Sequence, residues 1–177
     1  MKADLIFVTE HDGIFNKAIA WFTGKKKPAK AVHVAGITNR GSVIEALTTV
    51  RETPFLRWVC KHKKFEVWRN IDWTENTKQR ICDEMLEFKG RPYGFHKLFV
   101  IALDLAIAKV WKEKFLSRRL LFSENWPICT WVYAYAVHEV NGYEFGVKPE
   151  YTDPCLMRNH CLASREWQLV EKVDKNE

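Results

Sequence analysis

The stretch AVHVAGITNRGSVIEAL, residues 31–47, decides the fold of this chain. It holds two apolar runs, 31–37 and 42–47, which are rich in the β-branched residues that strands favour. The residues between them, Thr-Asn-Arg-Gly at 38–41, have the composition of a tight turn. The pattern predicts two antiparallel strands joined as a hairpin.

Two ionisable side chains interrupt this apolar hairpin. Because side chains alternate between the faces of a strand, His33 shares a face with Ala35, and Glu45 shares a face with Val43. A carboxylate within an apolar strand costs free energy unless it has a partner. His33, twelve residues earlier in the chain, is the natural candidate for that partner.

The length of the hairpin loop decides whether His33 and Glu45 meet. A three-residue loop at 38–40 places them directly opposite, and one at 39–41, with Gly41 left-handed, places them diagonally adjacent. A two-residue loop would put them on opposite faces. In either three-residue register we expect Glu45 to orient the imidazole, as the third member of a nucleophile–base–orienter triad does.

Cys129 is the candidate nucleophile. It follows Pro127 by two residues, and because Pro is favoured at the first helical position, we expect a helix from about 127 to 140 with Cys129 in its first turn. The free N–H groups and the dipole at a helix start stabilise a thiolate. Position alone leaves a second interpretation open, namely a buried core thiol.

The rest of the chain predicts an α+β fold, with a small antiparallel sheet packed against helices in a single domain, residues 1–177. We expect helices where apolar residues recur at helical spacing, and the segment that contains Pro54, before the strand at 65–68, is expected to form a loop. The further strands are expected at 5–8, 65–68 and 167–170, and the helices at 14–22, 74–89, 95–115 and from about 152.

The order of these pieces resembles the permuted branch of the NlpC-type papain-like superfamily, which includes YiiX-like proteins and relatives of lecithin:retinol acyltransferase. In this branch the histidine strand precedes the cysteine helix. The resemblance covers most of the chain. It is carried by Asp4–Val8, Trp21–Gly24, His33–Ile37, Val43–Ala46, Tyr93–Phe95, Ile128–Thr130 and Pro149–Leu156.

The resemblance implies a circularly permuted papain-like fold and a thiol hydrolase. Cys129 would be the nucleophile, His33 the base and Glu45 the residue that orients it, and Tyr93 is a candidate second donor to the oxyanion. The expected activity is that of a cysteine peptidase or amidase acting on a small peptide or cell-wall fragment. The alternatives are a lipid acyltransferase or esterase with the same triad, and a binding protein of the same fold without catalysis.

Composition and charge limit the partners and the cellular compartment that we expect for this protein. The net charge of +6 comes from scattered Lys and Arg clusters, so no nucleic-acid partner is expected. The apolar stretch at 98–111 is shorter than a membrane span, which predicts no transmembrane segment and leaves peripheral membrane contact open. Five cysteines without a pairing pattern, and no signal peptide, favour reduced thiols in the cytoplasm.

No cofactor or metal is expected. Cys60, His62, Cys155, His160 and Cys161 lack the paired Cys-x-x-Cys spacing of structural zinc sites. We interpret them as ordinary loop and core residues.

Overall fold

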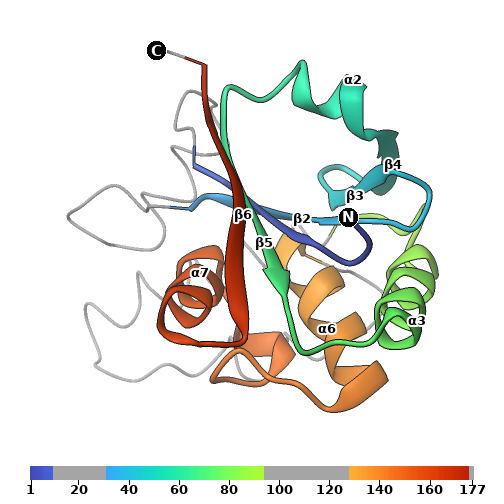
Figure 1. Cartoon of the computed structure of the whole chain (residues 1–177). Coiled ribbons are helices and arrows are strands. Elements are labelled where there is room, and N and C mark those ends of the chain that lie inside the picture. Colours follow the sequence, from blue (N-terminus) through green and yellow to red (C-terminus); the bar gives the residue numbers. More distant parts are fainter. Residues whose placement is uncertain (10–30, 94–127, 176–177) are drawn as a thin grey trace, which may run out of the picture.

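The computed structural model describes residues 1–9, 31–93 and 128–175. At its centre lies one six-stranded sheet, in which each neighbouring pair of strands is antiparallel, in the order β4-β3-β2-β1-β5-β6 (Figure 1). The expected antiparallel sheet with packed helices is therefore confirmed. The strands are β1 (Leu5–Val8), β2 (His33–Ile37), β3 (Ser42–Ala46), β4 (Val50–Pro54), β5 (Lys64–Asn70) and β6 (Trp167–Asp174).

The predicted hairpin forms from β2 and β3, in the diagonal register of the two alternatives. The backbone N–H of Thr38 donates to the carbonyl oxygen of Ser42 at 2.8 Å, which leaves a three-residue loop at 39–41. Gly41 closes that loop with φ 67°, a conformation that glycine adopts without strain. Ala35 pairs with Glu45, so His33 lies diagonally from Glu45 on the same face.

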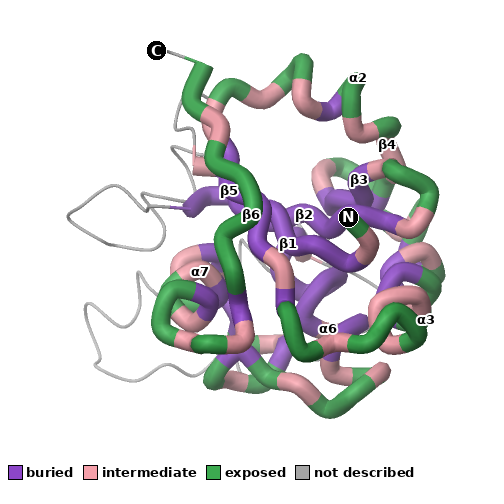
Figure 2. Tube along the Cα trace, viewed as in Figure 1, coloured by how far each residue is buried: buried purple, intermediate pink, exposed green. Residues whose placement is uncertain are grey.

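Apolar side chains cover both faces of the sheet, and β1 is buried on both. Leu5 and Phe7 belong to a large cluster with residues of the long helices, whereas Ile6 and Val8 belong to a second cluster around Trp58. Figure 2 shows the buried strands at the centre of the molecule. A strand buried on both faces is apolar at every position, which is why residues 5–8 were recognisable as a strand.

Helices α3 (Glu75–Leu86) and α6 (Cys129–Asn141) lie side by side on one face of the sheet (Figure 1). The buried residues of these two helices and of α7 (Pro154–Ala163) complete the large cluster. The second cluster, on the other face, is closed by a short helix that follows β4. The helices are α3 (Glu75–Leu86), α6 (Cys129–Asn141), α7 (Pro154–Ala163) and the short α2 (Phe55–Val59), and a 3₁₀ turn, η1, spans Pro149–Tyr151.

The helix boundaries follow capping chemistry. The Thr74 hydroxyl accepts the N–H of Thr77 at the start of α3, and the Asp153 carboxylate accepts two N–H groups at the start of α7. Gly142, left-handed at φ 70°, ends α6. The helix predicted from about 127 begins at Cys129, and the helix predicted over 74–89 ends at Leu86.

The expectation of a loop around Pro54 is wrong, because that segment forms β4 and α2. β4 is an edge strand whose residues Arg51, Glu52 and Thr53 are partly exposed, so it lacks the apolar run that marks a buried strand. Pro54 is accepted there because an edge strand has one unpaired side. The strands expected at 65–68 and 167–170 are longer in the structure. Their ends carry polar residues, which the apolar pattern used for the prediction did not include.

The helices expected at 14–22 and 95–115 lie outside the described residues, so they remain predictions, as does the single-domain extent of 1–177. Within residues 1–9, 31–93 and 128–175, no helix has the length and apolarity needed to cross a membrane.

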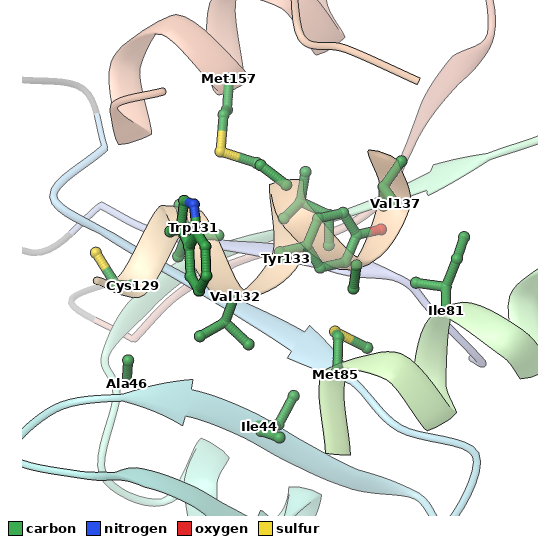
Figure 3. Close-up of a cluster of buried hydrophobic side chains, with 14 of the residues drawn as sticks. Ile44, Ala46, Ile81, Met85, Cys129, Trp131, Val132, Tyr133, Val137 and Met157 are labelled. Carbon is green, nitrogen blue, oxygen red and sulfur yellow. The ribbon is translucent and has the colours of Figure 1, made fainter. Parts of the chain in front are cut away.

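Gly36 of β2 lets α3 and α6 approach the sheet closely. A Cβ atom at this position would lie 2.5 Å from Sδ of Met85 and 3.0 Å from a ring carbon of Tyr133. Both side chains are buried, so neither has open space to move into. Figure 3 shows Met85 and Tyr133 within this cluster. The glycine therefore sets how closely the helices pack against the hairpin.

We predict that Gly36→Ala lowers the free energy of unfolding by about 1–3 kcal/mol, because the added methyl overpacks the core. Denaturant titration measures the loss. The double variant Gly36→Ala/Met85→Ala should lose less than the sum of its single variants, since removal of Met85 makes room for the methyl. Strictly additive losses would contradict this explanation.

Candidate active site

Cys129 is the first residue of α6, and 7% of it is exposed. The residue before it, Ile128, is extended and has no side-chain acceptor for the helix N–H groups. The sulfur takes that role, because the backbone N–H of Thr130 hydrogen-bonds to it. Figure 3 shows Cys129 at the start of α6, at the same end of the apolar cluster as Ala46. The thiol therefore lies where a negative charge is stabilised.

His33 and Glu45 lie on the opposite face of the sheet from most of α6. Ala35 and Val43, which share that face, belong to the cluster around Trp58. Nε2 of His33 donates to Oε2 of Glu45 over 3.1 Å, and the Glu45 side chain is only 1% exposed. The diagonal register of the hairpin thus brings together the two side chains that the sequence pairs.

The nucleophile meets this pair where the ladder between β2 and β3 ends. The last paired residues are Ala35 and Glu45, and Val34 lies one residue beyond them. The backbone N–H of Val34 hydrogen-bonds to the sulfur of Cys129. The N–H of Val34, which has no partner in the ladder to β3, therefore binds the first residue of α6. Because His33 is the neighbouring residue in the strand, this bond holds the thiol beside the imidazole.

The interaction between Cys129 and His33 favours an ion pair. Burial disfavours the imidazolium, but hydrogen bonds and charge from Cys129 and Glu45 raise the pKa of His33 from 6.5 to about 10. Burial also disfavours the thiolate, but the hydrogen bond and charge of His33 lower the pKa of Cys129 below its usual value. Since Nε2 of His33 binds Glu45, Nδ1 remains for the thiol.

Besides His33, two residues donate hydrogen bonds to Glu45. Trp58 donates Nε1 to Oε2 over 3.1 Å, the same oxygen that His33 binds. Arg51 donates Nε and Nη2 to Oε1 over 3.2 and 3.0 Å. Burial alone would raise the pKa of Glu45, but the hydrogen bond and charge of His33, with Trp58 and Arg51, lower it to about 2. The carboxylate is therefore charged and fully partnered.

Sequence reasoning missed Arg51 and Trp58. Arg51 lies on β4 and Trp58 lies on α2, in the segment that was expected to be a loop. Arg51 pairs directly with Glu45 across the ladder between β3 and β4. A search for a cation that balances the buried carboxylate would have pointed to Arg51 once β4 was recognised as a strand.

Tyr93, the predicted second donor to the oxyanion, also lies at the nucleophile. Its hydroxyl interacts with both the sulfur and the backbone N–H of Cys129. Burial and the nearby thiolate raise the pKa of Tyr93 far above its usual value, so the hydroxyl keeps its proton and can donate it in a hydrogen bond. The four residues predicted from the sequence, Cys129, His33, Glu45 and Tyr93, are therefore brought together.

The described residues do not fit a metal ion. No group of three or more His, Cys, Asp or Glu side chains in residues 1–9, 31–93 and 128–175 could hold one. Glu45 already has four N–H donors, and His160 binds the hydroxyl of Tyr143. All five cysteines are free thiols, and Cys60 is exposed whereas Cys161 is buried.

The pKa of Glu45 predicts a pH-dependent contribution to stability. The pKa is about 2 in the folded protein and about 4.5 in the unfolded chain, so the stabilisation is complete above pH 4.5 and is lost as the pH falls towards 2. We therefore predict that Glu45→Gln lowers the free energy of unfolding by about 3 kcal/mol at pH 7. This difference should shrink steadily below pH 4.5.

Denaturant titrations of both proteins from pH 3 to pH 7 measure this difference. A stability gap between wild type and Glu45→Gln that is the same at pH 3 and pH 7 would contradict a charged, partnered carboxylate.

Comparison with known proteins supports the fold. No family model matches the sequence, and no curated protein matches it. A crystal structure of the metalloprotein YiiX from Escherichia coli O157:H7, DUF1105, is similar to this chain, with a TM-score of 0.65 and 16% sequence identity. The similarity spans 98% of this chain and 98% of that one. The chain therefore has a YiiX-like fold.

Proposed function

We propose that this protein is a cysteine hydrolase of the permuted papain-like, NlpC-type kind, which cleaves an amide or ester bond through an acyl-cysteine intermediate. One observation carries the proposal: Glu45 binds His33, and His33 interacts with Cys129 at the start of α6. This is the arrangement of nucleophile, base and orienting residue that covalent catalysis requires.

The order of the three residues supports the permuted assignment. His33 comes from β2, Glu45 from β3 and Cys129 from α6, so the base precedes the nucleophile in the chain. The residues that carry the resemblance to the NlpC-type superfamily include all three. The YiiX-like fold agrees with that resemblance.

The first half of the reaction forms the acyl-enzyme. The Cys129 thiolate attacks the carbonyl carbon, a C–S bond forms and the carbonyl oxygen becomes negative. When this intermediate collapses, the bond to the leaving nitrogen or oxygen breaks and the His33 imidazolium gives that atom a proton. The backbone N–H of Cys129 and the hydroxyl of Tyr93 are the donors to the oxyanion.

The second half releases the acyl group. Neutral His33 removes a proton from water, which attacks the thioester carbon and breaks the C–S bond. The products are a carboxylic acid and the regenerated ion pair. The substrate classes we propose are small peptides, cell-wall fragments and lipid-like esters. A lipid acyltransferase would share the first half and replace water with another acceptor.

A test of the ion pair needs no substrate. We predict that iodoacetamide alkylates Cys129 with an apparent pKa well below the ~8.5 of an ordinary thiol. Peptide mass spectrometry after alkylation at a series of pH values follows each cysteine separately. Cys161, whose pKa is raised by burial, and Cys82, likewise raised, should react slowly and serve as internal comparisons.

The matched variants are Cys129→Ala, His33→Ala and Cys161→Ala. Cys129→Ala should form no acyl-enzyme with p-nitrophenyl acetate, His33→Ala should lose the low-pH alkylation, and Cys161→Ala should keep both properties. Five cysteines that alkylate alike, or an unchanged acyl-enzyme in Cys129→Ala, would refute the proposal and favour a binding protein.

Tyr93→Phe tests the oxyanion donor. Acyl transfer creates an oxyanion, whereas alkylation by iodoacetamide does not. We therefore predict that Tyr93→Phe slows acylation by p-nitrophenyl acetate by about 10²–10³-fold. The alkylation rate of Cys129 at high pH, where the thiolate is fully formed, should change much less. Equal losses in the two reactions would assign Tyr93 a packing role.

A further inference from the structure

Glu45 receives more hydrogen bonds than a partner of His33 needs. Four N–H groups point to its two oxygens, and His33 supplies one of them. The other three come from Arg51 and Trp58, which contact neither the nucleophile nor the imidazole in any hydrogen bond among the described residues. Their only shared partner in the site is the carboxylate.

Building on the proposed function, we propose that Arg51 and Trp58 are positioning residues, which fix the plane of the Glu45 carboxylate and so hold His33 in line with Cys129. They bind different oxygens of the carboxylate. Arg51 lies at the surface, with 44% of its side chain exposed, and binds Oε1 with two N–H groups. Trp58 is completely buried and binds Oε2.

Trp58 is itself held rigidly. Its ring stacks on His62 with centroids 4.1 Å apart and meets the edge of Phe65 at 5.3 Å. It belongs to the apolar cluster on the face of the sheet that carries His33. The indole N–H is therefore a fixed donor on the inner side of the carboxylate, where no water competes.

Loss of either donor should turn the carboxylate. Without the Trp58 N–H, Oε2 loses its buried donor, while the two hydrogen bonds from the partly exposed Arg51 to Oε1 remain. The carboxylate then rotates towards Arg51 and away from His33. Without the two-pronged Arg51 contact, Oε1 loses its fixed direction, because a lysine holds a carboxylate through a single point charge. In both cases the imidazolium is less well stabilised, and the Cys129 thiolate loses stabilisation with it.

The charged and titratable groups of this network come from several segments of the chain. Cys129 of α6 and Glu45 of β3 both face His33 of β2. Arg51 of β4 faces Glu45, Tyr93 faces Cys129, and His62, after α2, stacks on Trp58. Trp58→Phe and Arg51→Lys leave the charge of all of these groups unchanged. A shift in Cys129 reactivity in these variants therefore reports orientation rather than altered net charge.

The same chain contains a matched control. Glu66 of β5 accepts a hydrogen bond from Nε1 of Trp68 over 3.2 Å and a two-pronged contact from Arg158 over 2.7 and 2.9 Å. This second Trp–Glu–Arg cluster has the chemistry of the first without a histidine bonded to the carboxylate in the described part of the chain. Trp68→Phe and Arg158→Lys thus remove equivalent bonds elsewhere in the sheet.

The test is the pH profile of Cys129 alkylation by iodoacetamide in the four variants and the wild type. We predict that Trp58→Phe and Arg51→Lys slow alkylation at pH 6 by about threefold to tenfold, which corresponds to the net free energy of one hydrogen bond. The rate at high pH, where the thiolate is fully formed in every variant, should stay unchanged. Trp68→Phe and Arg158→Lys should match the wild type at both pH values. Alkylation of buried Cys82 and Cys161 reports any loss of folding.

The possible outcomes separate the two proposals. A wild-type Cys129 that reacts like an ordinary thiol would overturn the proposed function. A reactive wild-type Cys129 whose profile is unchanged in Trp58→Phe and Arg51→Lys, or shifts equally in Trp68→Phe and Arg158→Lys, would overturn the positioning role alone. If Trp58→Phe exposes Cys82, the half-exposed Arg51 carries the test through Arg51→Lys and its control.

Discussion

The buried carboxylate of Glu45 is the constraint on which the site depends. An unpaired charge at a position only 1% exposed would cost several kcal/mol, so the fold must supply it with donors. The donors come from three neighbouring elements: His33 on β2, Arg51 on β4 and Trp58 on α2. The need to partner one side chain therefore ties together the hairpin, the edge strand and the short helix, which are the elements that orient the imidazole.

The second constraint is geometric and concerns how the helix meets the sheet. The ladder between β2 and β3 stops at Ala35, and the N–H of Val34 just beyond it binds the sulfur of Cys129. Gly36 keeps the same strand close to α3 and α6, because any side chain there would collide with Met85. Because the β2–β3 ladder ends at Ala35, the start of α6 can pack beside the end of the sheet. Cys129, from one face of the sheet, thereby reaches His33 on the other face.

Much of the site was predictable from the sequence because its parts are local. The hairpin loop, with Gly41 in the left-handed conformation, sets the relation of His33 to Glu45 within one short segment. The position of Cys129 at a helix start follows from the residues around it. Arg51 and Trp58 could not be predicted in the same way. The β4 part of their segment is mostly polar, ends at Pro54 and lies at the edge of the sheet, and α2 is only five residues long, so the sequence of this segment resembles that of a loop.

By itself the sequence determined the hairpin, the apolar strand β1 and the helix that starts near Cys129, and it named His33 as the candidate partner of the carboxylate at 45. These features depend on alternation, turn chemistry and capping, which act over a few residues. Only the tertiary structure decided which hairpin register forms and therefore that His33 reaches Glu45, that the thiol lies at the end of the β2–β3 ladder, and that Arg51 and Trp58 also bind Glu45. Those outcomes depend on packing between segments far apart in the chain, where many arrangements satisfy the same local patterns.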